Sequence, residues 1–283
     1  MTDILILGGT GKTGRRLATD LREQGHTVRT AARSGADVTF AWDDPASRVA
    51  ALQGADRVYL VPPALRLDFA PLVAAFLDEA VAAGVGHVTF LSAGGVQYAP
   101  PEVPLRAVEL QLAGRDDLTH TILRPSWFLQ NLTEGFMQPM VADGELALPA
   151  GDGAEAFIDA EDIAAVAAAT LADPAAHAGR AYDLTGPEAI THADLVARIS
   201  AATGRDVRYV DADRAAWIDG VQAAGVPADY AQLLAGLLDL IRDGQGSRPT
   251  GDVAAVLGRP ARSVDAFIAD AAASGVWRAA APA

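Results

Sequence analysis

Short apolar runs alternate with amphipathic stretches through the first 125 residues. The apolar runs predict strands at residues 3–7, 26–31, 37–42, 56–61, 86–91 and 118–124. The amphipathic stretches predict helices near residues 12–24, 45–53, 67–84 and 101–113. Strands separated by helices form βαβ units, whose right-handed crossovers place helices on both faces of a sheet. The pattern therefore favours an α/β fold with a Rossmann-type doubly wound parallel sheet.

The pattern changes after residue 125. The segment SWFLQNLTEGFMQPM (residues 126–140) is dense in aromatic residues and methionine. Beyond it, helices are predicted at residues 159–173, 192–204, 211–224, 227–243 and 263–275, and short strands at 145–148 and 206–210. A strand at 179–184 is expected to rejoin the main sheet. We therefore expect a domain over residues 1–150, to which this late strand returns, and a small, mostly helical lobe over residues 151–283.

The N-terminal motif carries the strongest functional signal. Residues 3–14 read DILILGGTGKTG, an apolar strand that runs into four glycines, and a helical run begins at Arg15. Such glycines allow a tight turn and a close approach to a pyrophosphate, which the helix N-terminus attracts. We predict that residues 1–150 bind a dinucleotide, the alternative being a purely structural turn. The expected contacts in this motif are Gly8, Thr10, Gly11, Lys12, Thr13 and Gly14.

The end of the second predicted strand bears on the choice of nucleotide. An acid at this position binds the ribose 2′-hydroxyl of NAD, but here the strand ends in Arg33 and Ser34. The planar guanidinium of Arg33 suits a 2′-phosphate, and Lys12 and Arg15 add positive charge. We therefore predict NADP(H) in preference to NAD(H), unless Arg33 only solvates the strand end. Loops after other strands are expected to add cofactor contacts from Val61, Pro62, Ser92 and Ala93.

Composition excludes several other classes of protein. A net charge of −14 over 283 residues argues against nucleic acid and anionic membrane surfaces as partners. The absence of cysteine excludes disulfides and thiol catalysis, and the five histidines lack metal-ligand spacing. Asp159, Glu161 and Asp162 are interpreted as the acidic start of a helix, so no metal is expected. No signal peptide or membrane span is recognised, which predicts a cytoplasmic protein. Its expected partner is a small-molecule substrate, and both a monomer and a homodimer are compatible with the sequence.

Six motifs together resemble a known family. In order, they are GGTGKTGRR, VYLVPP, LSAGG, LRPSWFLQN, FIDAEDIA and YDLTGPEAIT. They resemble the NmrA-like branch of the atypical short-chain dehydrogenase/reductases, and in particular bacterial proteins similar to festuclavine and agroclavine dehydrogenases. The likeness runs from residue 3 to about residue 275. It implies a Rossmann core, a small substrate lobe and an NADPH-dependent reductase activity, although the same branch contains dinucleotide-binding regulators.

The sequence departs from ordinary short-chain dehydrogenases at the proton donor. Those enzymes use a Tyr-x-x-x-Lys pair, but Glu102 stands four residues after Tyr98, and the single lysine, Lys12, lies in the glycine motif. The usual tyrosine–lysine mechanism therefore cannot operate. Tyr98, Ser92 and Asn131 are the predicted catalytic contacts, and the resemblance places Asn131 near the active site. Their alternative roles are a loop tyrosine, a capping serine and a loop-fixing asparagine.

Without an activated proton donor, the favoured substrate accepts hydride easily, as an iminium ion, a quinone or an enone does. We predict NADPH-dependent reduction of a C=N, C=C or C=O bond in an apolar, polycyclic or aromatic small molecule of secondary metabolism. The predicted substrate contacts, which could instead be core residues, are Trp127, Phe128, Asn131, Phe136, Met137, Met140 and Phe157. A non-catalytic sensor and a non-redox isomerase or cyclase on this scaffold are the alternatives.

Overall fold

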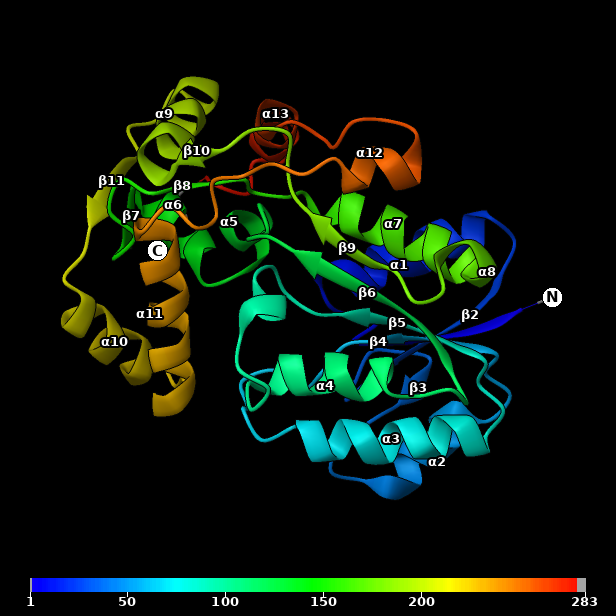
Figure 1. Cartoon of the computed structure of the whole chain (residues 1–283). Helices are drawn as coiled ribbons and strands as arrows, with labels where there is room; N and C mark the ends of the chain where they lie inside the picture. Colours follow the sequence, from blue (N-terminus) through cyan, green and yellow to red (C-terminus); the bar gives the residue numbers. More distant parts are fainter. Residues whose placement is uncertain (1, 279–283) are drawn as a thin grey trace. The chain divides into compact units, whose positions relative to one another are not determined.

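The computed structural model describes residues 2–278, and within them seven parallel strands form the main sheet (Figure 1). Their order is β3-β2-β1-β4-β5-β6-β9. The strand order therefore reverses between β1 and β4, because β2 and β3 are added on one side of β1 and the later strands on its other side. The strands span Asp3–Leu7 (β1), Thr27–Ala32 (β2), Val38–Thr39 (β3), Arg57–Leu60 (β4), His87–Leu91 (β5), Thr119–Pro125 (β6) and Ala181–Leu184 (β9). The predicted Rossmann-type doubly wound sheet is confirmed, and β9 rejoins it beside β6 as expected.

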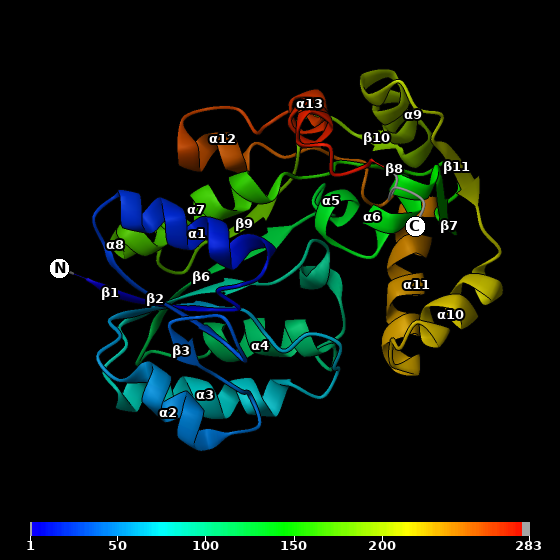
Figure 2. The same cartoon turned by 180° about the vertical axis from the view of Figure 1, so that it is seen from behind.

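Helices cover both faces of this sheet (Figures 1 and 2). One face carries α1 (Lys12–Glu23), α7 (Ala160–Ala172), α8 (Pro174–His177) and α12 (Asp252–Leu257). The other carries α2 (Pro45–Leu52), α3 (Ala70–Ala82) and α4 (Pro104–Ala113), and a short 3₁₀ helix, η1 (Val96–Tyr98), follows β5. Because helices bury both faces, Ile4–Leu7 of β1 is at most 1% exposed.

The third strand is shorter than its apolar pattern predicts. Only Val38 and Thr39 pair with β2, whereas the sequence predicts a strand over residues 37–42. Side chains take over the backbone beyond them, because Ser47 Oγ accepts from the Ala41 N–H at 3.0 Å and Arg48 donates to the Trp42 carbonyl at 2.6 Å. Burial of this segment therefore comes from aromatic packing rather than from strand pairing.

The chain divides into two compact units. Unit 1 holds the main sheet and comprises the residues up to Pro125, Ala160–Leu184 and Asp252–Arg259. Unit 2 comprises Ser126–Asp159, Thr185–Gly251 and the residues from Pro260 onward. This division is not a single cut at residue 150, since α7, β9 and α12 return to the sheet and its helices after the chain has entered unit 2.

Unit 2 has its own secondary structure and its own core. Its helices are α5 (Asn131–Glu134), α6 (Met137–Asp143), α9 (His192–Thr203), α10 (Arg214–Ala223), α11 (Ala228–Arg242) and α13 (Val264–Ser274). Its short strands are β7 (Glu145–Leu148), β8 (Ala154–Glu155), β10 (Ile190–Thr191) and β11 (Arg208–Asp211). Parallel pairing joins β11 to β7, and antiparallel pairing joins β10 to β8. Trp277 is buried in this core and donates from its indole N–H to the Leu132 carbonyl at 2.7 Å.

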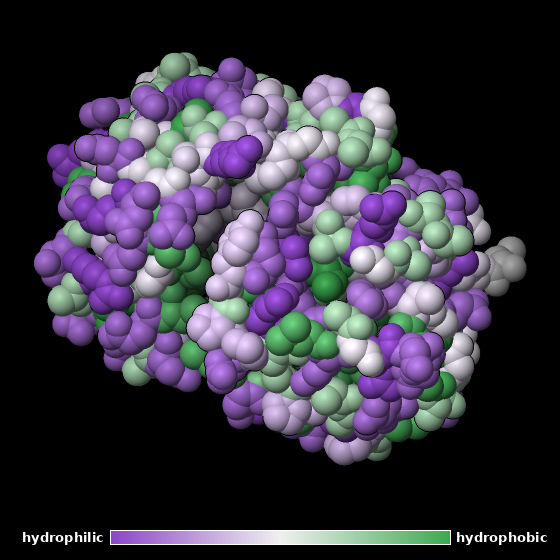
Figure 3. Space-filling view, in the orientation of Figure 1, coloured by the Kyte–Doolittle hydropathy of each residue, from purple (hydrophilic) through white to green (hydrophobic). Residues whose placement is uncertain are grey.

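Figure 3 shows hydrophilic side chains over much of one face, with apolar and intermediate residues among them. Among residues 2–278, none of the helices combines the length and the apolar composition that crossing a bilayer requires.

Candidate functional site

The turn between β1 and α1 needs glycine at several positions for different reasons. Gly8 has a φ of +64°, a conformation that L side chains rarely adopt. A Cβ on Gly9 would lie 2.4 Å from the Cβ of Thr30, and one on Gly14 would lie 2.3 Å from the Gly8 carbonyl oxygen. The turn is therefore closed tightly against β2 and against the helix, as a dinucleotide-binding turn requires.

The first turn of α1 follows the glycine turn directly. Its N-cap is Gly11, so no side chain caps this end of the helix, and a helix N-terminus of this kind suits an anion. Thr13 is fixed from below, because the buried phenol of Tyr59 on β4 donates to its hydroxyl at 3.1 Å. Burial raises the pKa of Tyr59 above its ordinary value, so the phenol stays protonated. The geometry of this turn is compatible with a bound pyrophosphate, and the roles of the residues from Gly8 to Gly14 as cofactor contacts stay predictions.

The loop after β2 lies over the glycine turn. A Cβ on Gly35 would be 3.8 Å from the Thr10 methyl group, and Arg33, in the same loop, is exposed. The nearby acid, Asp37, accepts from the N–H and the hydroxyl of Thr30 at 2.9 and 2.8 Å. These hydrogen bonds, helped by Arg22, hold the pKa of Asp37 below its ordinary value. The loop after β2 thus presents the exposed guanidinium of Arg33, whereas the carboxylate of Asp37 is hydrogen-bonded to Thr30.

The loop after β4 borders the same turn from the other side. The side chain of Val61 lies 3.5 Å from the position that a Cβ on Gly8 would occupy, and Pro62 follows it in the chain. The roles of Val61 and Pro62 as cofactor contacts stay predictions. Further along the loop, Leu65 has a φ of +59° and is 49% exposed. Strained non-glycine residues of this kind are concentrated at ligand-binding sites.

Ser92 follows β5 and is buried. Its N–H donates to the Leu123 carbonyl at 2.8 Å, and the Gly94 N–H donates to the Pro125 carbonyl at 2.8 Å, which prolongs the pairing of β5 with β6. The Ser92 hydroxyl donates to Glu109 at 2.7 Å. The structure thus directs this hydroxyl into the protein, and the half-buried Ala93 follows it in the loop.

Glu109 was not singled out by the sequence pattern, although it organises this edge of the sheet. It is 1% exposed and accepts two hydrogen bonds from Arg124, both at 2.8 Å, and one from Arg106 at 3.1 Å. Burial alone would raise the pKa of Glu109, but these bonds and that from Ser92 outweigh it and lower the pKa. The available signal was an acid on the buried face of α4, next to Val108.

The other predicted catalytic residues are placed differently. Tyr98 ends η1 and is 86% exposed, and Glu102 beyond it is also exposed. Asn131 begins α5 in unit 2 and is half-buried, with its backbone N–H bonded to the Phe128 carbonyl at 3.1 Å. Tyr98 belongs to unit 1 and Asn131 to unit 2.

The predicted substrate contacts divide between the core and the surface of unit 2. Met137 and Phe157 are 2% and 3% exposed and lie within the core, which is a packing position. Trp127 and Met140 are half-buried against that core, whereas Phe136 is 40% exposed. Phe128 is half-buried in a segment that pairs with residue 158.

Unit 2 also buries two titratable groups. Burial raises the pKa of Glu155 to about 8, although the N–H groups of Trp127 and Ala156 bond to its carboxylate. Burial lowers the pKa of His192 to about 4, and its ring stacks on Tyr209 with centroids 5.7 Å apart. Both groups are therefore predominantly uncharged at neutral pH.

The acids at the start of α7 have arginine partners. Glu161 pairs with Arg16 at 2.6 Å, and Asp162 pairs with Arg259 at 2.7 Å. Throughout the described residues, acidic, histidine and cysteine side chains form no group of three or more that could hold a metal ion.

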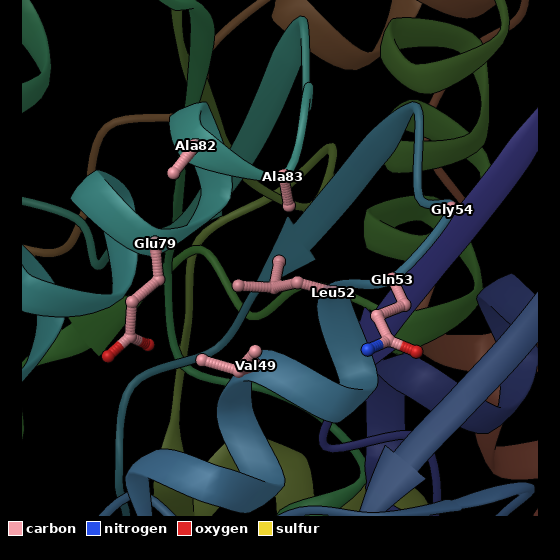
Figure 4. A pocket seen from close by; sticks show the side chains of 7 residues that line it. All are labelled: Val49, Leu52, Gln53, Gly54, Glu79, Ala82 and Ala83. Carbon is pink, nitrogen blue, oxygen red and sulfur yellow. The ribbon is translucent and has the colours of Figure 1, made fainter.

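A surface hollow of about 410 Å³ lies elsewhere in unit 1 (Figure 4). Its lining residues are Val49, Leu52, Gln53, Gly54, Glu79, Ala82 and Ala83. They end α2 and α3 and precede β4 and β5, so the hollow lies at the amino edge of the sheet, opposite the glycine turn. Its acid, Glu79, is bonded to Arg48 at 2.7 and 2.9 Å. The hollow is therefore not the candidate site.

Comparison with known proteins gives a consistent assignment. The model of the NmrA-like family matches residues 1–249. An uncharacterised oxidoreductase of Bacillus subtilis, YesF, is 38% identical, with 94% of each chain covered. The NAD(P)H azoreductase of Xenophilus azovorans is 33% identical over 93% of this chain and 96% of its own. Agroclavine dehydrogenase of Claviceps fusiformis is 30% identical over 94% and 96%.

Solved structures show the same fold. The NADPH-dependent quinone oxidoreductase QOR2 of Escherichia coli, complexed with NADPH, has a TM-score of 0.77 at 23% identity, covering 94% of this chain and 99% of its own. The negative transcriptional regulator NmrA, in complex with NAD, has a TM-score of 0.71 at 18% identity, covering 95% and 94%. The chain therefore belongs to the NmrA-like family, within the NAD(P)H-dependent oxidoreductases that its catalytic relatives represent.

Proposed function

We propose that this chain is an NADPH-dependent reductase that delivers hydride to a C=N, C=C or C=O bond of an apolar, polycyclic or aromatic small molecule. The observation that carries the proposal is the closed glycine turn, in which Gly9 and Gly14 leave no space for a Cβ. Relatives named as an azoreductase and an agroclavine dehydrogenase match almost the whole chain, which supports a reductase of nitrogen-containing or conjugated compounds.

The preference for NADPH rests on the loop after β2. Arg33 is exposed there. The carboxylate of Asp37 accepts hydrogen bonds from Thr30 and Arg22, so it is not poised to bind a ribose hydroxyl. A guanidinium recognises a phosphate with two parallel hydrogen bonds, whereas it gains little from a hydroxyl. Lys12 and Arg15 in the first turn of α1 add positive charge to this end of the unit.

The bound cofactor supplies the hydride, and the protein supplies orientation and a dry environment. Tyr98 and Asn131 are proposed to donate hydrogen bonds to the acceptor, since both have accessible polar groups. Trp127, Phe128 and Phe136 are proposed to contact its apolar part; the first two follow β6 by two and three residues. A substrate that already carries positive charge or conjugation suits a site without the tyrosine–lysine pair.

The test is NADPH oxidation by the purified protein with a panel of iminium, quinone, enone and azo compounds. We expect turnover with at least one class and loss of it in Asn131→Ala, with NADPH affinity preserved. NADPH binding without turnover of any class would contradict the reductase and favour a dinucleotide-binding regulator. The structural likeness to NmrA makes that regulator the second candidate.

A further inference from the structure

We infer that Arg124, held by the buried Glu109, is a positioning residue that fixes the Gln97–Tyr98 segment where the hydride acceptor binds. The inference rests on the proposed reductase function and assigns a role to a charged network inside unit 1. The network consists of Ser92, Gln97, Arg106, Glu109, Arg124 and Asp183.

The side chain of Arg124 is held in one orientation by Glu109. Its Nε and Nη2 atoms donate to the two carboxylate oxygens of Glu109, each at 2.8 Å, which is a bidentate pair. Glu109 also receives Ser92 Oγ at 2.7 Å and Arg106 Nη1 at 3.1 Å. Since both carboxylate oxygens are engaged and the side chain is 1% exposed, the guanidinium plane has one available orientation.

The remaining guanidinium nitrogen of Arg124 lies near β9. Its Nη1 atom lies 3.8 Å from Asp183 Oδ1 on β9. The same carboxylate accepts from the Gln97 amide at 3.3 and 3.4 Å. Burial raises the pKa of Asp183, and the charge of Arg124 opposes this shift. The guanidinium thus stabilises the carboxylate to which η1 is tethered.

The hydrogen bonds between Gln97 and Asp183 hold the loop that contains η1. Gly94 and Gly95 precede η1, and Gly95 has a φ of +79°, so the loop itself gives little stiffness. Besides the buried side chain of Val96, it is attached by the Gly94 N–H, which donates to the Pro125 carbonyl, and by the Gln97 amide, which donates to Asp183. Tyr98 follows Gln97 directly and is 86% exposed.

This segment lies at the carboxyl edge of the main sheet, after β5. Open parallel α/β sheets bind their ligands at this edge, where the chain order reverses. Arg124 therefore supplies, from β6, a fixed positive charge beside the Asp183 carboxylate that holds Gln97, the residue before Tyr98. The chain lacks the lysine four residues after this tyrosine. Changing the shape of Arg124 while keeping its charge should displace Tyr98 relative to the acceptor without altering the glycine turn.

The experiment compares Arg124→Lys with Arg48→Lys. Arg48 is a matched control, since it makes the same kind of bidentate pair with Glu79 in the same unit, between α2 and α3. For Arg124→Lys we expect kcat/KM for the acceptor to fall about ten- to a hundredfold, with the Kd for NADPH unchanged within about twofold. Hydrogen exchange at residues 94–98 should accelerate. Arg48→Lys should leave kcat/KM for the acceptor, the Kd for NADPH and hydrogen exchange at residues 94–98 unchanged.

Gln97→Ala provides a second variant that leaves the buried Arg124–Glu109 pair intact, in case Arg124→Lys does not fold. It should reproduce the faster exchange at residues 94–98 and the lower kcat/KM. Unchanged exchange and kinetics in Gln97→Ala, or an equal loss of acceptor and NADPH binding, would overturn the inference. Should the wild-type protein reduce no acceptor, the proposed function fails, and the exchange comparison alone still decides whether this network positions the segment.

Discussion

Tyr59 on β4 donates a hydrogen bond to Thr13 in the first turn of α1, with the two oxygens 3.1 Å apart and both residues buried. This bond joins the strand on one side of the chain reversal to the helix that follows the glycine turn. We expect Tyr59→Phe to lower the free energy of unfolding by about 1 kcal/mol and to weaken NADPH binding, because the first helical turn loses its anchor. Denaturant unfolding and NADPH titration measure the two effects.

Tyr182→Phe is the control for that prediction. It removes the hydrogen bond between Tyr182 and His177, which are 2.8 Å apart elsewhere in unit 1. Some stability should be lost, while the Kd for NADPH stays the same. Equal effects of the two variants on NADPH binding would mean that the Tyr59–Thr13 bond has no special link to the cofactor site.

Gly14→Ala should damage the cofactor site directly. Its Cβ would lie 2.3 Å from the Gly8 carbonyl oxygen, a backbone atom that can move only by opening the turn. We expect the Kd for NADPH to rise at least about tenfold. Gly86→Ala is the matched control, since the nearest atom to its Cβ would be 4.0 Å away. NADPH binding by Gly14→Ala at the wild-type affinity would contradict a phosphate site at this turn.

Glu155 should make stability fall as the pH rises from the ordinary carboxyl pKa of 4.5 to about 8. Its pKa is raised to about 8 in the folded protein, so the native state holds a proton that the unfolded chain releases at lower pH. Stability is therefore fully present below the unfolded pKa and is lost as the pH rises towards 8. We expect Glu155→Gln to remove roughly 3–5 kcal/mol of this loss, measured as unfolding free energies at about pH 5 and about pH 9. Parallel pH profiles of the two proteins would refute a buried, protonated Glu155.

His192 should act on the acid side. Burial lowers its pKa to about 4, so the native state resists the proton that the unfolded chain accepts near its ordinary value. The stability that depends on neutral His192 is present above the unfolded pKa and is lost as the pH falls towards 4. His192→Phe keeps a ring against Tyr209 and Phe157 and should reduce the acid sensitivity of unfolding. An unchanged acid limb would show that the imidazole is hydrated in the native protein.

Local sequence features predict the sheet and the glycine turn well. The central strands β1, β4 and β5 are buried on both faces and therefore read as apolar runs. The late strand within residues 179–184 lies at the edge of the sheet beside β6, and only its last residue, Leu184, is buried. The requirement for glycine at positions 8, 9 and 14 is visible because a short-range turn imposes it. These are features in which neighbours along the chain determine the structure.

Features set by distant residues could not be read in the same way. The third strand stops at Thr39 because Ser47 and Arg48 from α2 bond the backbone that follows. Glu109 acquires its role only when Ser92 and Arg124 meet it from two strand ends. Met137 has the same composition signal as a pocket residue, but the packing of unit 2 places it in the core.

A fluorescence titration with NADPH and NADH, on the wild-type protein and on Arg33→Ala, tests whether Arg33 in the loop after β2 selects NADPH. An exposed control, Arg180→Ala, lies far along the chain from the loop after β2. We expect the wild-type protein to bind NADPH at least about tenfold more tightly than NADH, Arg33→Ala to remove this difference, and Arg180→Ala to keep it. Equal or tighter binding of NADH by the wild-type protein would contradict this preference for NADPH.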